Sequence, residues 1–169
     1  MMAPRTPTDY LEVKISSMSW LKWSKRHWAY EARIAKRRAD RILLSRGYLP
    51  PAQARILGHW MAATFYGWTG EQWNCLDRLW GTKDGQTLES GWDVLADNPT
   101  SPALGVAQTD PWTKLRTAVP VSWLVANPHF KWWQSAYVQI KWGLKYIRTN
   151  GNFSSPCEAL NYRLDNHSY

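Results

Sequence analysis

Hydrophobic and polar positions follow a helical spacing from Ser19 to about Ser45. Apolar residues fall near every third or fourth position in this stretch, and most of the residues between them are Lys or Arg. A glycine and two consecutive prolines, in "RGYLPP", end the pattern. We therefore expect an N-terminal segment, residues 1–50, that contains one basic helix, followed by a separate domain, residues 51–169.

The domain begins with two further helical patterns. The first spans Ala52–Phe65 and is expected to end at Gly67. The second, "TGEQWNCLDRLW", starts at Thr69, and Gln72 follows three residues later. This spacing is typical of a capping box, in which the two side chains satisfy each other's backbone N–H groups.

A strong late helix is predicted in "SAYVQIKWGLKYIRTN", where Val138, Trp142 and Tyr146 share one stripe. A short last helix is expected after Pro156. Between these helices, residues 81–88 contain two glycines and predict a loop, and "ALGVAQ" allows a short strand at Leu104–Gln108. The expected fold class is mainly α, with a few short strands.

Composition adds an excess of tryptophan, with 13 among 169 residues. Aromatic rings fill protein cores, and they also line clefts in which sugars or bases stack. We expect any single tryptophan to lie in the core. The sequence contains no run of about 18 apolar residues, so we expect no transmembrane helix. The N-terminus also lacks the apolar region of a signal peptide.

Charge is distributed unevenly along the chain. Residues 1–58 hold 12 Lys or Arg against 4 Asp or Glu, whereas residues 59–169 hold 9 of each. The net charge of +8 is therefore carried by residues 1–58, and nearly all of it by the N-terminal segment. Such a segment suits an acidic protein partner, anionic wall polymers, nucleic acid or, through its tryptophans, a membrane surface.

The two cysteines, Cys75 and Cys157, form either one disulfide or two free thiols. With the four histidines they show no spacing typical of metal ligands, so we expect neither a metal nor another cofactor. Candidate chemistry is concentrated instead in "TLESGWDVLADNPTSPALGVAQ", which contains one carboxylate, Glu89, followed by Ser-Gly-Trp.

Four stretches of the chain together carry a resemblance, in the order "GW-x3-QW-x-CL-x2-LW … ESGW-x3-A-x-NP-x-S-x-A-x-G-x2-Q … QI-x-WGL-x-YI … SPC". From about Ala52 to the C-terminus the chain resembles lytic transglycosylases of the lysozyme-like superfamily. Within them it is similar to the short actinobacterial branch of transglycosylase or aggregation-promoting-factor-like proteins. The resemblance implies a lysozyme-like α+β fold and peptidoglycan glycan strands as substrate. It also implies a Cys75–Cys157 disulfide, because both cysteines fall at matched positions.

In this family one carboxylic acid protonates the glycosidic oxygen and then accepts the proton of the muramic acid C6 hydroxyl, which closes a 1,6-anhydro ring. The resemblance gives this role to Glu89, and Asp93 and Asp97 have no matching role. Trp92 would supply apolar surroundings that raise the pKa of the acid. By the same matching, Ser90 hydrogen-bonds near the acid and Gly105 lets the backbone approach the sugar. Gln108 binds substrate polar groups, and Tyr146 faces Glu89 across the cleft. The residues alone also fit other roles for these three positions. Ser90 fits a helix cap, Gln108 fits a surface residue and Tyr146 fits a core residue.

The chain departs from the family pattern immediately before the acid. Residues 81–88 separate the Leu-Trp of the third helix from Glu89, six residues more than in the family. Without this gap Lys83 and Asp84 would fall at the Glu-Ser positions, but the downstream match favours the gap. In "SPALGVAQ", Pro102 also replaces a glycine and Leu104 a tyrosine.

A wall-cutting domain without a signal peptide fits a bacteriophage protein, carried in the virion or released on lysis. The hypothesis is therefore a lytic transglycosylase whose residues 1–50 dock to a virion protein. The competing hypothesis is a structural tail or capsid protein that keeps the fold without the activity, which the insertion favours. Binding of nucleic acid is the weakest hypothesis, because it rests only on residues 18–46.

Overall fold

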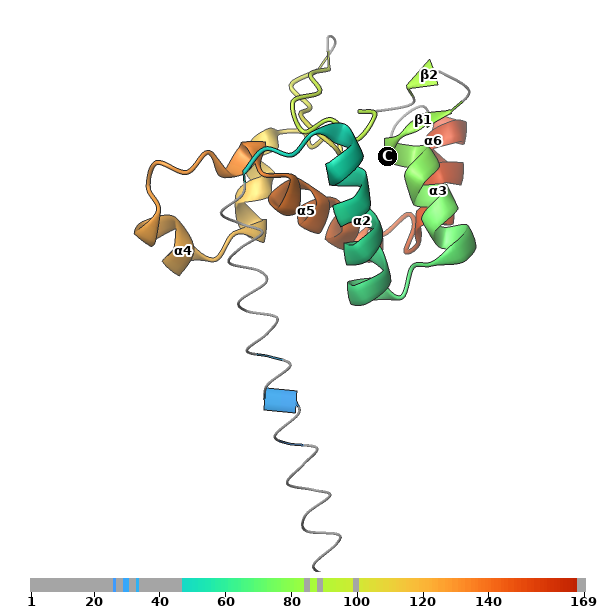
Figure 1. Cartoon of the computed structure of the whole chain (residues 1–169). Coiled ribbons are helices and arrows are strands. Elements are labelled where there is room, and N and C mark those ends of the chain that lie inside the picture. Colours follow the sequence, from blue (N-terminus) through green and yellow to red (C-terminus); the bar gives the residue numbers. More distant parts are fainter. Residues whose placement is uncertain are drawn as a thin grey trace, which may run out of the picture. The chain divides into compact units, whose positions relative to one another are not determined.

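The computed structural model describes residues 47–83, 86–87, 90–98 and 101–166, together with Arg26, Ala29, Tyr30 and Arg33 (Figure 1). The chain divides into two compact units, residues 1–42 and 43–169. The four described residues of the first unit are helical and exposed. The rest of the predicted basic helix lies outside the described residues.

The second unit begins with α2 (Pro51–Tyr66) and α3 (Gly70–Trp80). Both helices were predicted. A proline occupies the first turn of α2, where its missing N–H costs no hydrogen bond. The helix ends at Gly67, which adopts φ 68° and donates its N–H to the carbonyl of Ala63. Glycine adopts this left-handed conformation without the steric penalty of a side chain.

The predicted capping box at the start of α3 is wrong. Thr69 is the N-cap residue, but its side chain makes no capping hydrogen bond. Gln72 instead accepts a hydrogen bond from the backbone N–H of Cys157, at 3.2 Å between Oε1 and N. A tertiary contact with the C-terminal helix has replaced the local one.

Two predictions for the loops need correction. The segment expected as a loop at residues 81–88 contains a hairpin of β1 (Thr82–Lys83) and β2 (Gln86–Thr87), which pair antiparallel. The strand expected at Leu104–Gln108 is absent from that described segment. Leu104 makes only isolated bridges, to Asp97 and Thr109, because the chain turns immediately after it at Gly105.

The second half of the unit contains two 3₁₀ helices and three α-helices, of which the late helix and the last one were predicted. The elements are η1 (Trp112–Ala118), α4 (Val121–Ala126), η2 (Trp132–Gln134), α5 (Ala136–Thr149) and α6 (Pro156–Asn166). Ser135 caps α5, since its side chain accepts the backbone N–H of Val138. The described part of the chain is thus mainly helical, as predicted.

Helix α5 forms the centre of this unit (Figure 1). It packs against α2, η1 and η2, while α3 packs along α6. Most of α5 is buried, including the fully buried Ile140, Leu144 and Ile147. In the part of the chain described here, no helix is long and apolar enough to cross a membrane.

Candidate functional site

The candidate site lies where the chain returns to the core after the β1–β2 hairpin. Glu89, the predicted acid, lies outside the described residues, but the next residue, Ser90, is buried. The Ser90 hydroxyl lies within donating distance of two backbone carbonyl oxygens, 3.2 Å from Trp80 at the end of α3 and 2.9 Å from Val106. It also accepts the N–H of Trp92 at 3.2 Å. Ser90 therefore joins α3 to the later loop and fixes the chain directly after Glu89.

Trp92 is a buried core residue. Its ring packs on Trp73 and Trp80, with ring centroids 5.6 and 5.3 Å apart. It approaches α2 so closely that a Cβ atom added at Gly58 would lie 2.6 Å from Cη2 of the indole. Its Nε1 donates to Oδ1 of Asp77 at 3.0 Å. This tryptophan thus positions the segment after Glu89 by packing as well as by hydrogen bonding.

Asp77 is held by a second partner on α2. Arg55 donates to both of its carboxylate oxygens, each at 2.7 Å. The hydrogen bond from Arg55 to Asp77 raises the pKa of the guanidinium above its usual value. Both oxygens of this carboxylate are therefore engaged, and Asp77 serves as a structural tie between α2, α3 and Trp92.

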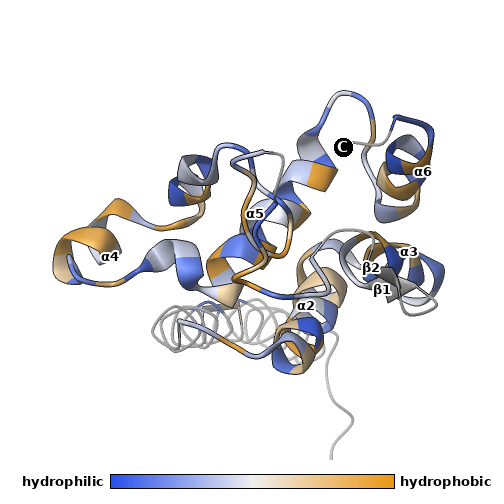
Figure 2. Cartoon of the chain, turned by 90° about the horizontal axis from the view of Figure 1, so that it is seen from above, coloured by the Kyte–Doolittle hydropathy of each residue, from blue (hydrophilic) through white to orange (hydrophobic). Residues whose placement is uncertain are grey.

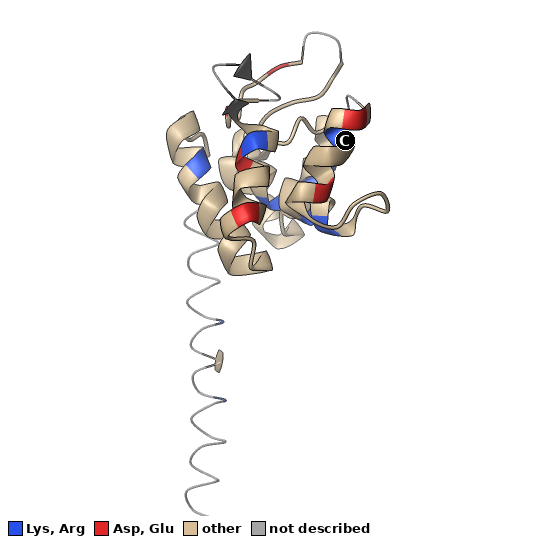
Figure 3. Cartoon of the chain, turned by 90° about the vertical axis from the view of Figure 1, so that its right-hand side faces the viewer, with Lys and Arg blue, Asp and Glu red and all other residues tan. Residues whose placement is uncertain are grey.

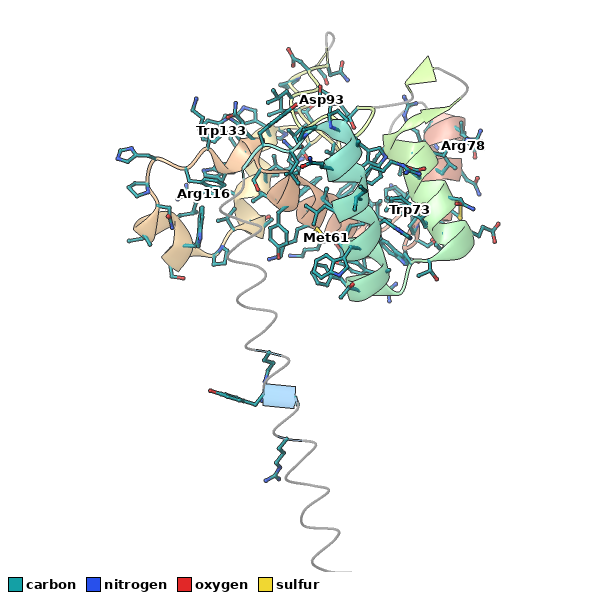
Figure 4. All side chains as sticks on the ribbon, viewed as in Figure 1. Met61, Trp73, Arg78, Asp93, Arg116 and Trp133 are labelled. Atoms are coloured by element: carbon teal, nitrogen blue, oxygen red, sulfur yellow. A yellow bond between two sulfur atoms is a disulfide. The ribbon has the colours of Figure 1, made fainter. Side chains whose placement is uncertain are left out.

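A cavity of about 300 Å³ opens at this junction. It is formed by the first turns of α2, the side of α3 and the residues that flank the β1–β2 hairpin on both sides. Its lining residues are Pro51, Ala52, Arg55, Asp77, Gly81, Gly91 and Trp92. Figure 4 shows the crowded side chains of α2 and α3 in this region, around the labelled Trp73. The volume is at the small end of the range for ligand pockets.

Gln139 of α5 organises the loop opposite Ser90, and no role was predicted for it. Its side chain is fully buried. Oε1 accepts the N–H of Val106 at 2.8 Å, and Nε2 donates to the carbonyls of Val94 and Trp133 at 2.9 and 2.7 Å. A buried amide with all three of these bonds ties the chain before and after residue 100 to α5. The signal available in the sequence was an amide on the same helical face as Gly143, in an otherwise apolar stretch.

Gly105 lies directly against this amide. Its φ is 75°, and a Cβ atom placed on it would lie 2.5 Å from Nε2 of Gln139 and closer still to Oε1 and Cδ. Its N–H donates to the carbonyl of Ala96 at 2.8 Å. The close approach that glycine permits here is therefore to a side chain of the protein itself.

Gln108 also has a positive φ, 45°, and is half-buried. Its Nε2 donates to the carbonyls of Gly105 at 3.0 Å and Ala96 at 3.4 Å. Together with the Ser90 hydrogen bond to Val106, these bonds bring Ser90, Gly105 and Gln108 into one continuous cluster.

Tyr146 lies elsewhere on α5, seven residues or about 10 Å along the helix from Gln139. Its ring stacks on Trp142, with centroids 5.1 Å apart and planes at 10°, and meets the edge of Phe153 at 6.0 Å. These aromatic contacts tie the C-terminal half of α5 to the segment that leads into α6. The structure does not test whether Tyr146 faces Glu89, since Glu89 is outside the described residues.

The predicted disulfide is confirmed. Cys75 of α3 and Cys157 of α6 are bonded, with an S–S distance of 2.12 Å, and they are 82 residues apart in the sequence. The bond lies along the α3–α6 contact and is reinforced by the hydrogen bond between Gln72 and Cys157. It thus braces the helix that ends where the candidate site begins.

Among the described residues, no group of three or more His, Cys, Asp or Glu side chains is arranged to hold a metal ion. Comparison with known proteins adds no relative, because no family model, no curated protein and no solved structure matches the chain.

Proposed function

We propose that this protein is a lytic transglycosylase that cuts the β-1,4 bond between N-acetylmuramic acid and N-acetylglucosamine in peptidoglycan. The observation that carries the proposal is the junction at Ser90. Ser90 and Trp92 fix the chain directly after Glu89 against the end of α3, and a cavity opens between the two flanks of the inserted hairpin. A carboxylate attached to so fixed a backbone position can be oriented toward a bound substrate.

The chemistry requires only one carboxyl group. Glu89 in its protonated form donates a proton to the glycosidic oxygen as the bond to the muramic C1 breaks. The resulting carboxylate then accepts the proton of the muramic C6 hydroxyl, and the C6 oxygen forms the new bond to C1. The acid is regenerated, and no water enters the product.

The assignment of the acid to Glu89 is supported by the hydrogen bonds that the described acids near the cavity already make. Both oxygens of Asp77 are occupied by Arg55, and Oδ1 of Asp93 accepts the N–H of Leu95 at 2.9 Å in a tight turn. Each of these carboxylates already makes a structural hydrogen bond within the protein. We assign the general acid and base roles to Glu89 on this ground and on the resemblance.

We further propose that the protein acts from a bacteriophage virion or after release to the cell wall, with residues 1–50 docking to a virion protein. The support is the concentration of positive charge in that segment, which holds 11 Lys or Arg against 4 Asp or Glu. Docking through charge weakens as salt screens it. Removal of residues 1–50 should then abolish incorporation into the virion.

A structural virion protein is the second candidate, and a specific observation favours it. The hydrogen-bonding groups of Ser90 and Gln108 are directed to backbone carbonyls of the protein itself, and Gly105 is covered by Gln139. In these contacts the three residues hold the loops of the protein together.

A digest of intact peptidoglycan by the wild type and by Glu89→Gln distinguishes the two candidates. Glutamine keeps the shape of the side chain but carries no proton to donate, so turnover should fall about 10²–10⁴-fold. Asp84→Asn is the matched control, since it removes an acid from the inserted segment. Mass spectrometry should show 1,6-anhydro muropeptides, one water lighter than hydrolysed ones. Release of no muropeptides by the wild type would favour the structural protein.

A further inference from the structure

The neutral domain has a strongly segregated charge pattern. Residues 111–157 contain six Lys or Arg and no Asp or Glu, so all nine acids of residues 59–169 lie outside this stretch. The stretch builds η1, α4, η2 and α5. By contrast, the α3–α6 side that faces the viewer in Figure 3 carries both acidic and basic residues. One region of the domain therefore has a positive field that no acid within its own sequence offsets.

Part of this charge lines a groove of about 270 Å³ between the end of η1 and α5. Lys141 and Lys145 are one helical turn apart and so share a face of α5. Trp142 lines the same groove, and the Nζ of Lys141 lies over the ring of Tyr137, 5.3 Å from its centroid. The opposite wall is the segment Thr117–Pro120, which contributes no charge. Two ammonium groups beside an indole and an apolar wall suit a singly charged anion, such as a phosphodiester, with an apolar portion.

Helix α4 begins directly after this wall and exposes two aliphatic side chains. Val121 and Val125 are 73% and 77% exposed, and none of the six residues of α4 is buried. The two valines are four residues apart and lie on one face of the helix. Figure 2 shows α4, coloured as hydrophobic, at the edge of the domain and away from α5 and α2.

The exposed valines belong to an arm, residues 121–130, that is held in place by its own contacts. Trp123, on the opposite face of α4 from the valines, packs edge-to-face on Phe130 with ring centroids 4.5 Å apart. Asn127 then closes the helix, donating from Nδ2 to the carbonyl of Trp123 at 2.9 Å. These contacts hold the arm from one side and leave the valines turned outward. In Figure 4 the labelled Arg116 and Trp133 mark the same side of the domain, away from Arg78.

We propose that this region, named the α4–α5 face and defined by Val121, Val125, Lys141, Trp142 and Lys145, binds the surface of an anionic phospholipid membrane. The lysines meet lipid phosphates in and beside the groove, and the valines enter the boundary between headgroups and acyl chains. A nucleic acid or a soluble anionic polymer would satisfy the lysines but offers no apolar layer for the valines. The proposal does not depend on the proposed glycan cleavage.

Sedimentation of the full-length protein with vesicles tests the proposal, using phosphatidylglycerol mixed with phosphatidylcholine against phosphatidylcholine alone. Lys141→Gln/Lys145→Gln should weaken partitioning to the anionic vesicles about 25-fold, since a lysine near such a surface contributes about fivefold. Val121→Ser/Val125→Ser should weaken it about tenfold, at high as well as low salt. The N-terminal segment is the same in every variant, so these differences report on the α4–α5 face alone.

Matched control variants carry the same changes elsewhere in the chain. Ile56→Ser/Leu164→Ser removes two aliphatic side chains that are 69% and 45% exposed, and Lys83→Gln/Arg163→Gln removes two positive charges. Both should bind the anionic vesicles within about twofold of the wild type, and near-UV circular dichroism checks that each variant is folded. The proposal is overturned if the valine variant binds like the wild type. It is also overturned if a short DNA duplex competes fully with the vesicles and the valine variant binds that duplex as well as the wild type does.

Discussion

The most informative perturbation of the candidate site is a single methyl group at Gly105. Alanine there meets two costs. The first is the backbone conformation, because φ is 75° and a left-handed residue with a side chain costs about 1–2 kcal/mol. The second is steric, because the new Cβ would lie 2.5 Å from Nε2 of Gln139 and closer still to Cδ and Oε1.

The steric cost follows from what Gln139 holds. If its amide is displaced, the N–H of Val106 and the carbonyls of Val94 and Trp133 lose their partners. An unsatisfied buried polar group costs about 1–3 kcal/mol, and relaxation recovers part of this, so we expect about 3 kcal/mol from the three bonds. Gly105→Ala should therefore lower the free energy of unfolding by about 4–5 kcal/mol.

Gly67→Ala is the matched control. Its φ is 68°, but a Cβ atom there would meet nothing within 4 Å, so only the backbone cost of about 1–2 kcal/mol applies. Urea unfolding followed by tryptophan fluorescence gives both values. In a Gln139→Ala background the three atoms nearest to the methyl at position 105 are removed, and Gly105→Ala should then cost about as much as Gly67→Ala. Equal losses for the two glycines in the wild-type background would refute the reasoning.

Two further predictions concern the C-terminal helix. Replacement of both Cys75 and Cys157 by serine should lower the free energy of unfolding by about 4–5 kcal/mol on the chain-entropy model for a loop of this length, and a loss below about 1 kcal/mol in urea would contradict it. The carboxylate of Glu158 accepts hydrogen bonds from the backbone and hydroxyl of Ser154, which lower its pKa, the backbone bond most. This stabilisation is fully present above the unfolded pKa of about 4.3 and is lost as the pH falls through the lower folded value. Glu158→Gln should therefore lower Tm at pH 7 but not at pH values below the folded pKa, and an equal loss at both pH values would argue against the carboxylate.

The elements that the sequence predicted well are those with local causes. Helix α2 ends at Gly67 because only the conformation of that residue is needed to stop it, and α5 follows from apolar spacing across 14 residues. The pairing of Cys75 with Cys157 is different, since spacing left two free thiols open and only the resemblance indicated the bond that the structure shows.

Elements without local causes were missed or mistaken. Gln72 has the spacing of a capping box, but a backbone N–H 85 residues away competes for its side chain. The hairpin at Thr82–Lys83 and Gln86–Thr87 is too short to give a periodic pattern, as are η1, α4 and η2. In such segments tertiary packing, rather than propensity, decides the backbone.

For the candidate site, the sequence supplied the residues and the tertiary structure supplied their partners. The order Glu-Ser-Gly-Trp and the later Gly and Gln are readable in the chain, but the bonds of Ser90 to Trp80 and Val106 are not. Nor is the role of Gln139, whose three hydrogen bonds join residues up to 45 positions apart. A buried polar group must find a partner, and the sequence states that requirement. Which partner it finds depends on which segments the folded core brings within about 3 Å, and only the three-dimensional packing decides that.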